Sequence, residues 1–183
     1  NYPQNPTGRV ITKHEMTELV RVVQRSGALF LHDMAYADLD FHSRFSHSIF
    51  DCGVEREEVK RFAVEVFSMS KSYSMPGWRV AFMAGNRRMI NALAHMKTYL
   101  DYGTFAPLQY AAAWALTNAD NVASELRDLY RGRATALVDG LNRGGWQNVA
   151  EASGTMFVSA ELPTGKREEG PMAAVIDLLE KAH

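Results

Sequence analysis

Residues 68–79, SMSKSYSMPGWR, place a lysine among serines and an arginine eight positions after it. The stretch follows an apolar run, residues 62–67 (FAVEVF), which is typical of a strand buried in a sheet. A lysine at a strand end is usually a solvated surface charge, and a serine-rich loop is usually only a connection. The meaning of Lys71 and Arg79 therefore depends on which other polar residues the fold brings near them.

Two neighbouring strands are expected to end in polar side chains. Three apolar runs predict strands: residues 28–32, 62–67 and 78–84. The first suits a strand buried on both faces and delivers Asp33, and the second delivers Ser68, Ser70 and Lys71. Because open α/β sheets bind ligands at the carboxyl ends of their strands, we expect an α/β fold with a binding site at this edge.

The rest of the chain carries well-marked helix signals. Thr12 and Glu15 form a capping box ahead of an apolar stripe that ends at Gly27, and Asn86 is expected to cap a second helix reaching Leu100. The apolar stripes are expected to lie in the core. Further expected elements are a polar loop (42–58), a buried alanine-rich helix after the break at 103–107 and reaching Leu116, a long helix (120–142), short strands (146–150 and 155–162) and a final helix (172–182).

A break near Gly144 is the expected domain boundary. Residues 1–143 would form part of a large domain together with a long connecting helix, and residues 144–183 an incomplete small α+β domain. The chain opens on NYPQNPTG with no initiator methionine, and the final part is too short for a whole domain. We therefore expect a fragment that lacks both ends.

Composition narrows the function classes. The 183 residues carry a formal net charge of -1, which gives no electrostatic reason to expect nucleic acid or an anionic membrane as a partner. Cys52 is the only cysteine and is interpreted as a buried small hydrophobe, so the sequence predicts no intrachain disulfide, and a cytoplasmic location fits. The histidines lack the paired spacing of metal ligands, so no metal site is expected. Residues 102–119 are uncharged but contain glycine, proline and amide residues that argue against a membrane span.

Three motifs occur in a fixed order: NPTG at residues 5–8, DMAY at 33–36 and SMSKSYSMPGWR at 68–79. Each alone is commonly a turn, a cap or a solvated loop. Together they resemble the pyridoxal-phosphate-dependent aminotransferases of the aspartate aminotransferase fold group, class I/II. The stretch YGTFAPLQ, residues 102–109, is similar to the alanine and LL-diaminopimelate aminotransferase subgroup.

The resemblance implies the fold and the partners of the protein. The fold would be the type I fold of pyridoxal-phosphate-dependent transferases, here the C-terminal half of the large mixed-sheet domain plus the start of the small domain. The activity would be transfer of an amino group from an amino acid, with alanine, glutamate or LL-diaminopimelate as donor, to a 2-oxo acid, a reaction of amino acid biosynthesis. A homodimer is implied, in which Tyr102, Gly103 and Thr104 reach toward the neighbour's site.

The catalytic residues that the resemblance implies are Lys71, Asp33 and Tyr36. Pyridoxal phosphate acts as an electron sink while its ring nitrogen stays protonated, and a carboxylate bonded to that nitrogen, here Asp33, raises the nitrogen's pKa. Lys71 would hold the cofactor as a Schiff base and, once released, carry a proton.

The remaining cofactor contacts follow from the same resemblance. Ser68 and Ser70 with the guanidinium of Arg79 would bind the phosphate. Asn5 and Tyr36 would bond the phenolic oxygen of the cofactor ring.

Other functions remain open at this stage. The same fold and lysine support β-elimination or decarboxylation, because the cofactor carries the difficult chemistry. A non-catalytic pyridoxal-binding sensor module is a further alternative, as is an inactive fragment. The phosphate loop and ring-stacking aromatic of the family's N-terminal half are absent from this chain, as is the family's C-terminal arginine that grips the substrate carboxylate.

Overall fold

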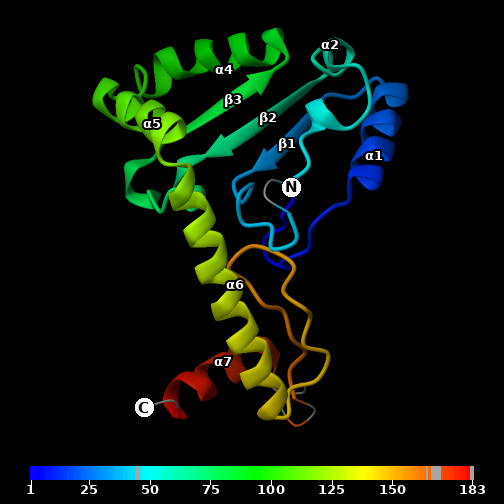
Figure 1. Cartoon of the computed structure of the whole chain (residues 1–183), viewed down its shortest axis with the longest axis vertical. Helices are drawn as coiled ribbons and strands as arrows, with labels where there is room; N and C mark the ends of the chain where they lie inside the picture. Colours follow the sequence, from blue (N-terminus) through cyan, green and yellow to red (C-terminus); the bar gives the residue numbers. More distant parts are fainter. Residues whose placement is uncertain (44–45, 164, 166–169, 182–183) are drawn as a thin grey trace.

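The computed structural model describes residues 1–43, 46–163, 165 and 170–181. At its centre lies a three-stranded sheet in the order β1-β2-β3. Strands β1 (Phe30–Met34) and β2 (Ala63–Ser68) run parallel, and β3 (Ala81–Gly85) pairs antiparallel with β2. The expected mixed α/β architecture is confirmed (Figure 1).

Helices surround the sheet and extend well beyond it. Helix α1 lies beside β1, α4 and α5 lie toward the β3 side, and α6 runs away from the sheet to the end of the molecule that holds α7 (Figure 1). The helices are α1 Lys13–Ser26, α2 Arg56–Val59, α3 Met69–Ser72, α4 Arg87–Leu100, α5 Ala106–Asn118, α6 Asp120–Arg143 and α7 Gly170–Lys181, with short 3-10 helices η1 Ile49–Asp51 and η2 Pro76–Trp78.

Helix α1 forms where its capping signals predict it. The backbone N–H of Glu15 donates to the Thr12 hydroxyl at 3.2 Å, and the Glu15 carboxylate accepts from the Thr12 backbone N–H at 2.8 Å. The helix ends at Gly27, whose φ of 70° is the left-handed conformation that glycine adopts without strain. Its buried residues, Met16 and Val20, join a core cluster that includes the buried Cys52.

Strands β1 and β3 differ from their expected bounds. β1 starts and ends later than residues 28–32, so Asp33 lies inside the strand and not after it. The expectation that this strand is buried on both faces is wrong, because His32 and Met34 are buried whereas Leu31 is 55% exposed. β3 begins only at Ala81, since residues 76–78 form a 3-10 turn and Arg79 has a left-handed φ of 54°.

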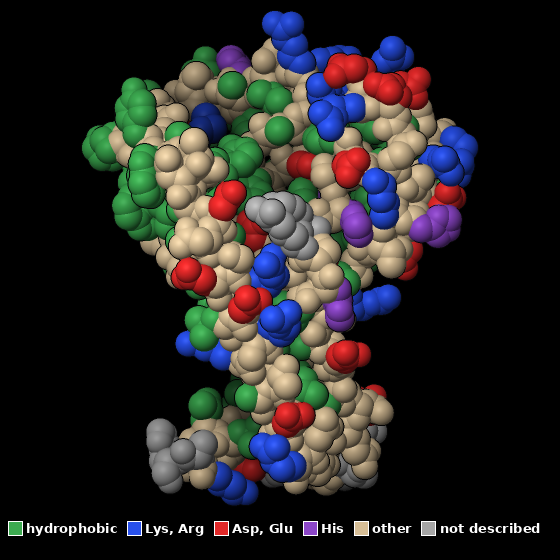
Figure 2. Space-filling view, in the orientation of Figure 1, with side chains coloured by type: hydrophobic (Ala, Val, Ile, Leu, Met, Phe, Trp, Pro, Cys, Tyr) green, Lys and Arg blue, Asp and Glu red, His purple; other side chains and the backbone are tan. Residues whose placement is uncertain are grey.

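The apolar face of α4 does not lie in the core of the described chain, contrary to expectation, whereas α5 is buried along one side, where Ala112 and Ala115 join a core cluster with Met69. On α4, Met96 is 58% exposed and Leu100 is 74% exposed, and on α5 only Ala112 and Ala115 are buried. Figure 2 shows apolar side chains gathered on the side of the molecule where α5 lies. Periodicity identifies an apolar face but does not say which residues cover it.

The segments after α6 are extended but form isolated bridges in place of the two expected strands. Gln147 pairs with Glu161, and the N–H of Ala150 donates to the carbonyl of Ser159 at 2.8 Å. Positive φ values at Asn148 and Thr155 (48° and 66°) interrupt the extended backbone that a ladder needs.

The other expected elements fit with small shifts. α6 ends at Arg143, next to the expected boundary at Gly144. α7 covers the described part of the final helix, whereas Ala182 lies outside the described residues. The expected loop 42–58 contains η1 and most of α2, with residues 44–45 outside the described part. The division into domains 1–143 and 144–183 stays a prediction.

Gly85 at the end of β3 provides a test of this packing. Its φ is 130°, and a Cβ added there would lie 2.5 Å from the carbonyl oxygen of Ala63 and 2.8 Å from the Phe50 ring. We expect Gly85→Ala to lower the free energy of unfolding by about 3 kcal/mol, since backbone strain and overpacking add. Chemical denaturation measures this change.

Gly132→Ala is the matched control for Gly85→Ala. Gly132 lies inside α6 with nothing within 4 Å of an added Cβ. We expect this variant to gain roughly 0.5–1 kcal/mol, because alanine favours the helix. Equal effects of the two substitutions would contradict the described packing.

Candidate active site

The turn after β1 brings Tyr36 into the interior. The carboxylate of Asp33 accepts from the backbone N–H of Ala35 at 2.9 Å, and the N–H of Ala37 donates to the carbonyl of Met34 at 3.0 Å. These two bonds close the turn. The Tyr36 side chain is buried at 8% exposure, whereas Asp33 stays exposed.

Lys71 is held by a single helical turn that follows β2 directly. Ser68 ends the strand and caps α3, its hydroxyl accepting from the N–H of Ser70 at 3.2 Å. Met69 is completely buried and fixes the turn in the core, while Lys71 is only partly buried. A serine cap at the strand-to-helix junction thus explains why serines and lysine share this stretch.

The parallel pairing of β1 and β2 brings the two turns together at one edge of the sheet. Met34 pairs with Phe67, so both chains leave the sheet side by side. The Nζ of Lys71 lies 5.9 Å from the centre of the Tyr36 ring. Within the described residues, no carboxylate lies at ion-pair distance from this amine.

The loop at the start of the chain completes the cluster. The Asn5 side-chain amide donates to the Tyr36 hydroxyl at 3.4 Å. Burial raises the pKa of Tyr36, the hydrogen bond from Asn5 opposes the rise, and the charge of Asp33 adds to it. Asn5, Asp33, Tyr36 and Lys71, predicted from three separate motifs, therefore lie in the same region of the fold.

The pairing of β3 with β2 brings Arg79 to the same edge of the sheet. The N–H of Met69 donates to the carbonyl of Val80 at 3.1 Å, and Ala81 pairs with Ser68, so Arg79 lies beside the serine turn. Its exposed guanidinium donates to the carbonyl of Pro76 at 2.8 Å. In the part of the chain described here, no bond joins this guanidinium to Ser68, Ser70 or Lys71.

The polar groups at this edge fit pyridoxal phosphate. The segments that meet at the ends of β1 and β2 supply an amine, an exposed carboxylate, two serine hydroxyls, a guanidinium, a phenol and an amide. The amine has no acidic partner among the residues that the structure describes. Together these groups are the set that an aldehyde, a protonatable ring nitrogen, a phosphate and a phenolic oxygen require.

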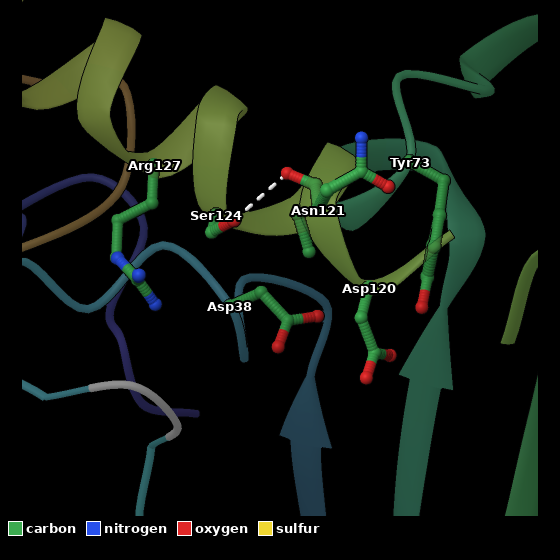
Figure 3. Close-up of a pocket in the computed structure, with 7 residues that line it drawn as sticks. Asp38, Tyr73, Asp120, Asn121, Ser124 and Arg127 are labelled. Atoms are coloured by element: carbon green, nitrogen blue, oxygen red, sulfur yellow. Dashed lines mark hydrogen bonds between the residues drawn. The ribbon is translucent and has the colours of Figure 1, made fainter. Parts of the chain in front are cut away.

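A separate cavity of about 280 Å³ lies where α6 begins. Asp38, Tyr73, Asp120, Asn121, Ser124 and Arg127 line it (Figure 3). Asp38 and Asp120 extend their carboxyl groups into the same space, and the Ser124 hydroxyl donates to the carbonyl of Asn121 at 2.8 Å. Sequence reasoning missed this cavity, and none of the predicted site residues lines it.

Among the residues that line this cavity, Asp38 has a carboxyl group whose pKa is shifted by burial. It is 6% exposed, and burial raises the pKa of its carboxyl group. The nearby Ser72 hydroxyl and the charge of Arg127 lower this pKa, whereas Asp120 raises it, and the net shift is upward. The folded protein therefore holds this proton more tightly than the unfolded chain does.

The pH dependence of stability follows from this shift. The contribution of Asp38 is fully present below its unfolded pKa of about 3.9 and is lost as pH rises through the folded pKa. We therefore expect Asp38→Asn, which has no proton to lose, to become more stable relative to wild type as pH rises to neutrality. Urea unfolding at several pH values measures this difference.

The exposed Asp51, which pairs with Lys13 at 3.5 Å, is the control position for this experiment. Asp51→Asn removes a carboxylate without relieving burial. A difference between Asp38→Asn and wild type that stays constant with pH would contradict the assignment.

Two expected absences concern the described residues only. Within them no cluster of three or more histidine, cysteine or acidic side chains could hold a metal ion. No helix in the same residues is long and apolar enough to cross a bilayer.

The fold is an α/β domain in which polar side chains gather at the carboxyl ends of the parallel strands β1 and β2, the edge where such sheets commonly bind ligands. The family model "Aminotransferase class I and II" matches residues 1–183, and the chain belongs to this family. Members of the family use pyridoxal phosphate.

Individual relatives agree with this assignment. The chain is 36% identical over 181 residues to the glutamate-pyruvate aminotransferase AlaC of Escherichia coli, covering 99% of this chain and 43% of AlaC. It is 36% identical over 165 residues to an LL-diaminopimelate aminotransferase of Desulforudis audaxviator, covering 90% of this chain and 41% of that protein. The substrate-bound BacF structure from Bacillus subtilis superposes with a TM-score of 0.85 at 28% identity, covering all of this chain and 45% of BacF. The chain thus spans less than half the length of these relatives.

Proposed function

We propose that the protein carrying this chain transfers an amino group from an amino acid to a 2-oxo acid, with pyridoxal phosphate bound at the edge formed by β1 and β2. The observation that carries the proposal is the convergence of Lys71, Tyr36 and Asn5 at this edge. Membership of the aminotransferase family supports it. The names of AlaC and of the LL-diaminopimelate aminotransferases favour alanine, glutamate or LL-diaminopimelate as donor.

Each residue has a distinct part in this proposal. The bound cofactor supplies an electron sink for the bond broken at the substrate's α-carbon. Lys71 would hold the cofactor covalently through its aldehyde carbon, with loss of water, and once displaced by the substrate's amine it would move the substrate's α-proton. Asp33 holds a proton on the ring nitrogen, and Tyr36 with Asn5 orients the ring through its phenolic oxygen.

The phosphate end of the cofactor is assigned to the serine turn. Ser68 and Ser70 lie at the start of α3, and Arg79 enters beside them through the pairing of β3 with β2. In the proposed complex Arg79 exchanges its bond with the Pro76 carbonyl for a charge-assisted bond to phosphate, which is the stronger of the two.

The assembly and location remain part of the proposal. Tyr102 is 92% exposed in a left-handed conformation just before α5, which suits a loop that reaches a second subunit of a homodimer. Gly103 and Thr104 belong to the same loop. A cytoplasmic location belongs to the same proposal and is supported by Cys52, which is free and buried.

A panel of amino donors with pyruvate or 2-oxoglutarate tests the function. We expect a new amino acid and a new 2-oxo acid to form in equal amounts, with alanine, glutamate or LL-diaminopimelate as the best donor. Release of ammonia or of carbon dioxide in place of a new amino acid would identify a β-lyase or a decarboxylase. Cofactor binding without turnover of any donor would identify a sensor module.

A further inference from the structure

Phe157 lies against the phenol that the proposed function uses. Its ring meets the Tyr36 ring edge-on, with the centres 5.8 Å apart and the planes at 68°. Tyr36 is then contacted at its hydroxyl by Asn5, over its face by Lys71 and by the ring of Phe157. Edge-to-face contacts of this kind favour particular relative orientations of the two rings.

The backbone just before Phe157 is hydrogen-bonded to residues 39–41, which follow Tyr36 in the chain. The N–H of Phe41 donates to the carbonyl of Ser153 at 3.0 Å, and the N–H of Thr155 donates to the carbonyl of Leu39 at 2.8 Å. Thr155 is completely buried, and its hydroxyl accepts from the N–H of Phe157 at 3.1 Å. The ring of Phe157 is therefore presented by a well-anchored turn.

The same segment packs on the loop that carries Asn5. A Cβ added to Gly8 would lie 3.0 Å from the carbonyl oxygens of both Gly154 and Phe157. The hydroxyl of Ser159 donates to the carbonyl of Pro6 at 3.4 Å. Residues 153–159 thus contact both of the segments that supply Tyr36 and Asn5.

We propose that Phe157 is a positioning residue for the aminotransferase site, which holds the Tyr36 phenol in the orientation that bonds the phenolic oxygen of the cofactor. The inference rests on the proposed function. Phe157 acts through its contact with Tyr36. The segment 153–159 also packs against the loop that carries Asn5 and so holds Asn5 near the Tyr36 hydroxyl. Loss of the ring frees Tyr36 to turn about its Cα–Cβ bond, which moves its hydroxyl and weakens the bond that the hydroxyl makes.

The pKa of the lysine–cofactor linkage is the diagnostic quantity, because a donor to the phenolic oxygen favours the unprotonated linkage. The experiment uses the whole protein loaded with pyridoxal phosphate, and its visible absorbance is followed against pH. We expect Tyr36→Phe to raise this pKa and Phe157→Leu to raise it in the same direction by a smaller amount. Phe157→Tyr keeps the ring and is expected to return the pKa to that of wild type.

The double variant separates positioning from general damage. Tyr36→Phe combined with Phe157→Leu is expected to shift the pKa no further than Tyr36→Phe alone, because both changes remove the same bond. Phe82→Leu is the matched control: Phe82 stacks on Phe67 with ring centres 5.1 Å apart, and its loss is expected to leave the linkage pKa unchanged. If Phe157→Leu does not fold, Phe157→Met replaces it, since methionine keeps most of the volume without a ring.

The experiment distinguishes failure of the Phe157 inference from failure of the proposed function. A linkage pKa equal to wild type in Phe157→Leu, together with a shift in Tyr36→Phe, would overturn the role of Phe157 and leave the proposed function intact. A wild-type protein with no visible band would overturn both. An additive double variant would show that Phe157 acts on the linkage by a route other than Tyr36 and would also overturn the inference.

Discussion

Replacing Lys71 with alanine is expected to abolish the visible absorbance band of the bound cofactor and to lower amino-group transfer by several orders of magnitude. Lys71 is the amine that α3 presents beside Tyr36, and the variant keeps the serine cap that forms the turn. Cofactor binds the variant only through non-covalent contacts, so it washes out on dialysis more readily. Absorbance spectra and turnover measured before and after dialysis report the two effects.

Lys60→Ala is the control for this experiment. Lys60 pairs with Glu57 at 2.6 Å on the surface and lies outside the cluster. It is expected to keep both the band and the activity. A Lys71→Ala protein that retained the visible band would show that another amine holds the cofactor.

Asp33→Ala is expected to leave cofactor partly bound while slowing loss of the substrate's α-proton by several orders of magnitude. Without a carboxylate at this position nothing raises the pKa of the ring nitrogen, and the electron sink weakens. The Asp33 carboxylate also accepts a hydrogen bond from the backbone N–H of Ala35, so a modest loss of stability is expected as well. Exchange of the α-hydrogen with deuterated water, followed by NMR, measures the step directly.

The charge of Asp33 can be separated from its structural bond. Asp33→Asn keeps a side-chain oxygen able to accept from Ala35 but has no charge, so it is expected to fold like wild type and to exchange as slowly as the alanine variant. Near-normal exchange in either variant would contradict the role of Asp33 as the partner of the ring nitrogen.

Much of the local structure was predictable because it depends on short-range chemistry. The capping box at Thr12, the left-handed Gly27 and the Asn86 cap all involve groups within a few residues of one another. The Asn86 carboxamide oxygen accepts from the N–H of Met89 at 3.0 Å, as its position before an amphipathic stretch predicts.

Burial was less predictable than helix position. The stripe on α4 contains Leu93, Met96 and Leu100, and the first of these is 42% exposed. A stripe has the same spacing whether the residues that cover it lie within the described chain or elsewhere. The expected strands around Asn148 and Thr155 did not form because a left-handed residue interrupts a ladder. Asparagine adopts that conformation more often than most residues, but a β-branched threonine rarely does, so the sequence gives no signal for it at Thr155.

The candidate site likewise has residues that the sequence predicts and residues that it does not. Asn5, Tyr36, Lys71 and Asp33 were predicted from motifs in a fixed order. The parallel pairing of β1 and β2 brings the turns that carry Tyr36 and Lys71 together, and Asn5 joins them through its bond to Tyr36. Phe157 lies far along the chain from Tyr36 and approaches it through backbone bonds to Leu39 and Phe41 that no local pattern encodes. The cavity beside Asp38 likewise depends on where α6 begins relative to the turn after β1.

The position of the covalent bond is the most direct test of the central claim. The protein carrying this chain is loaded with pyridoxal phosphate, reduced with borohydride to make the linkage permanent, digested and analysed by mass spectrometry. The account predicts the added mass of the reduced cofactor on the peptide that contains Lys71. Added mass on a different lysine, or on none, would contradict it.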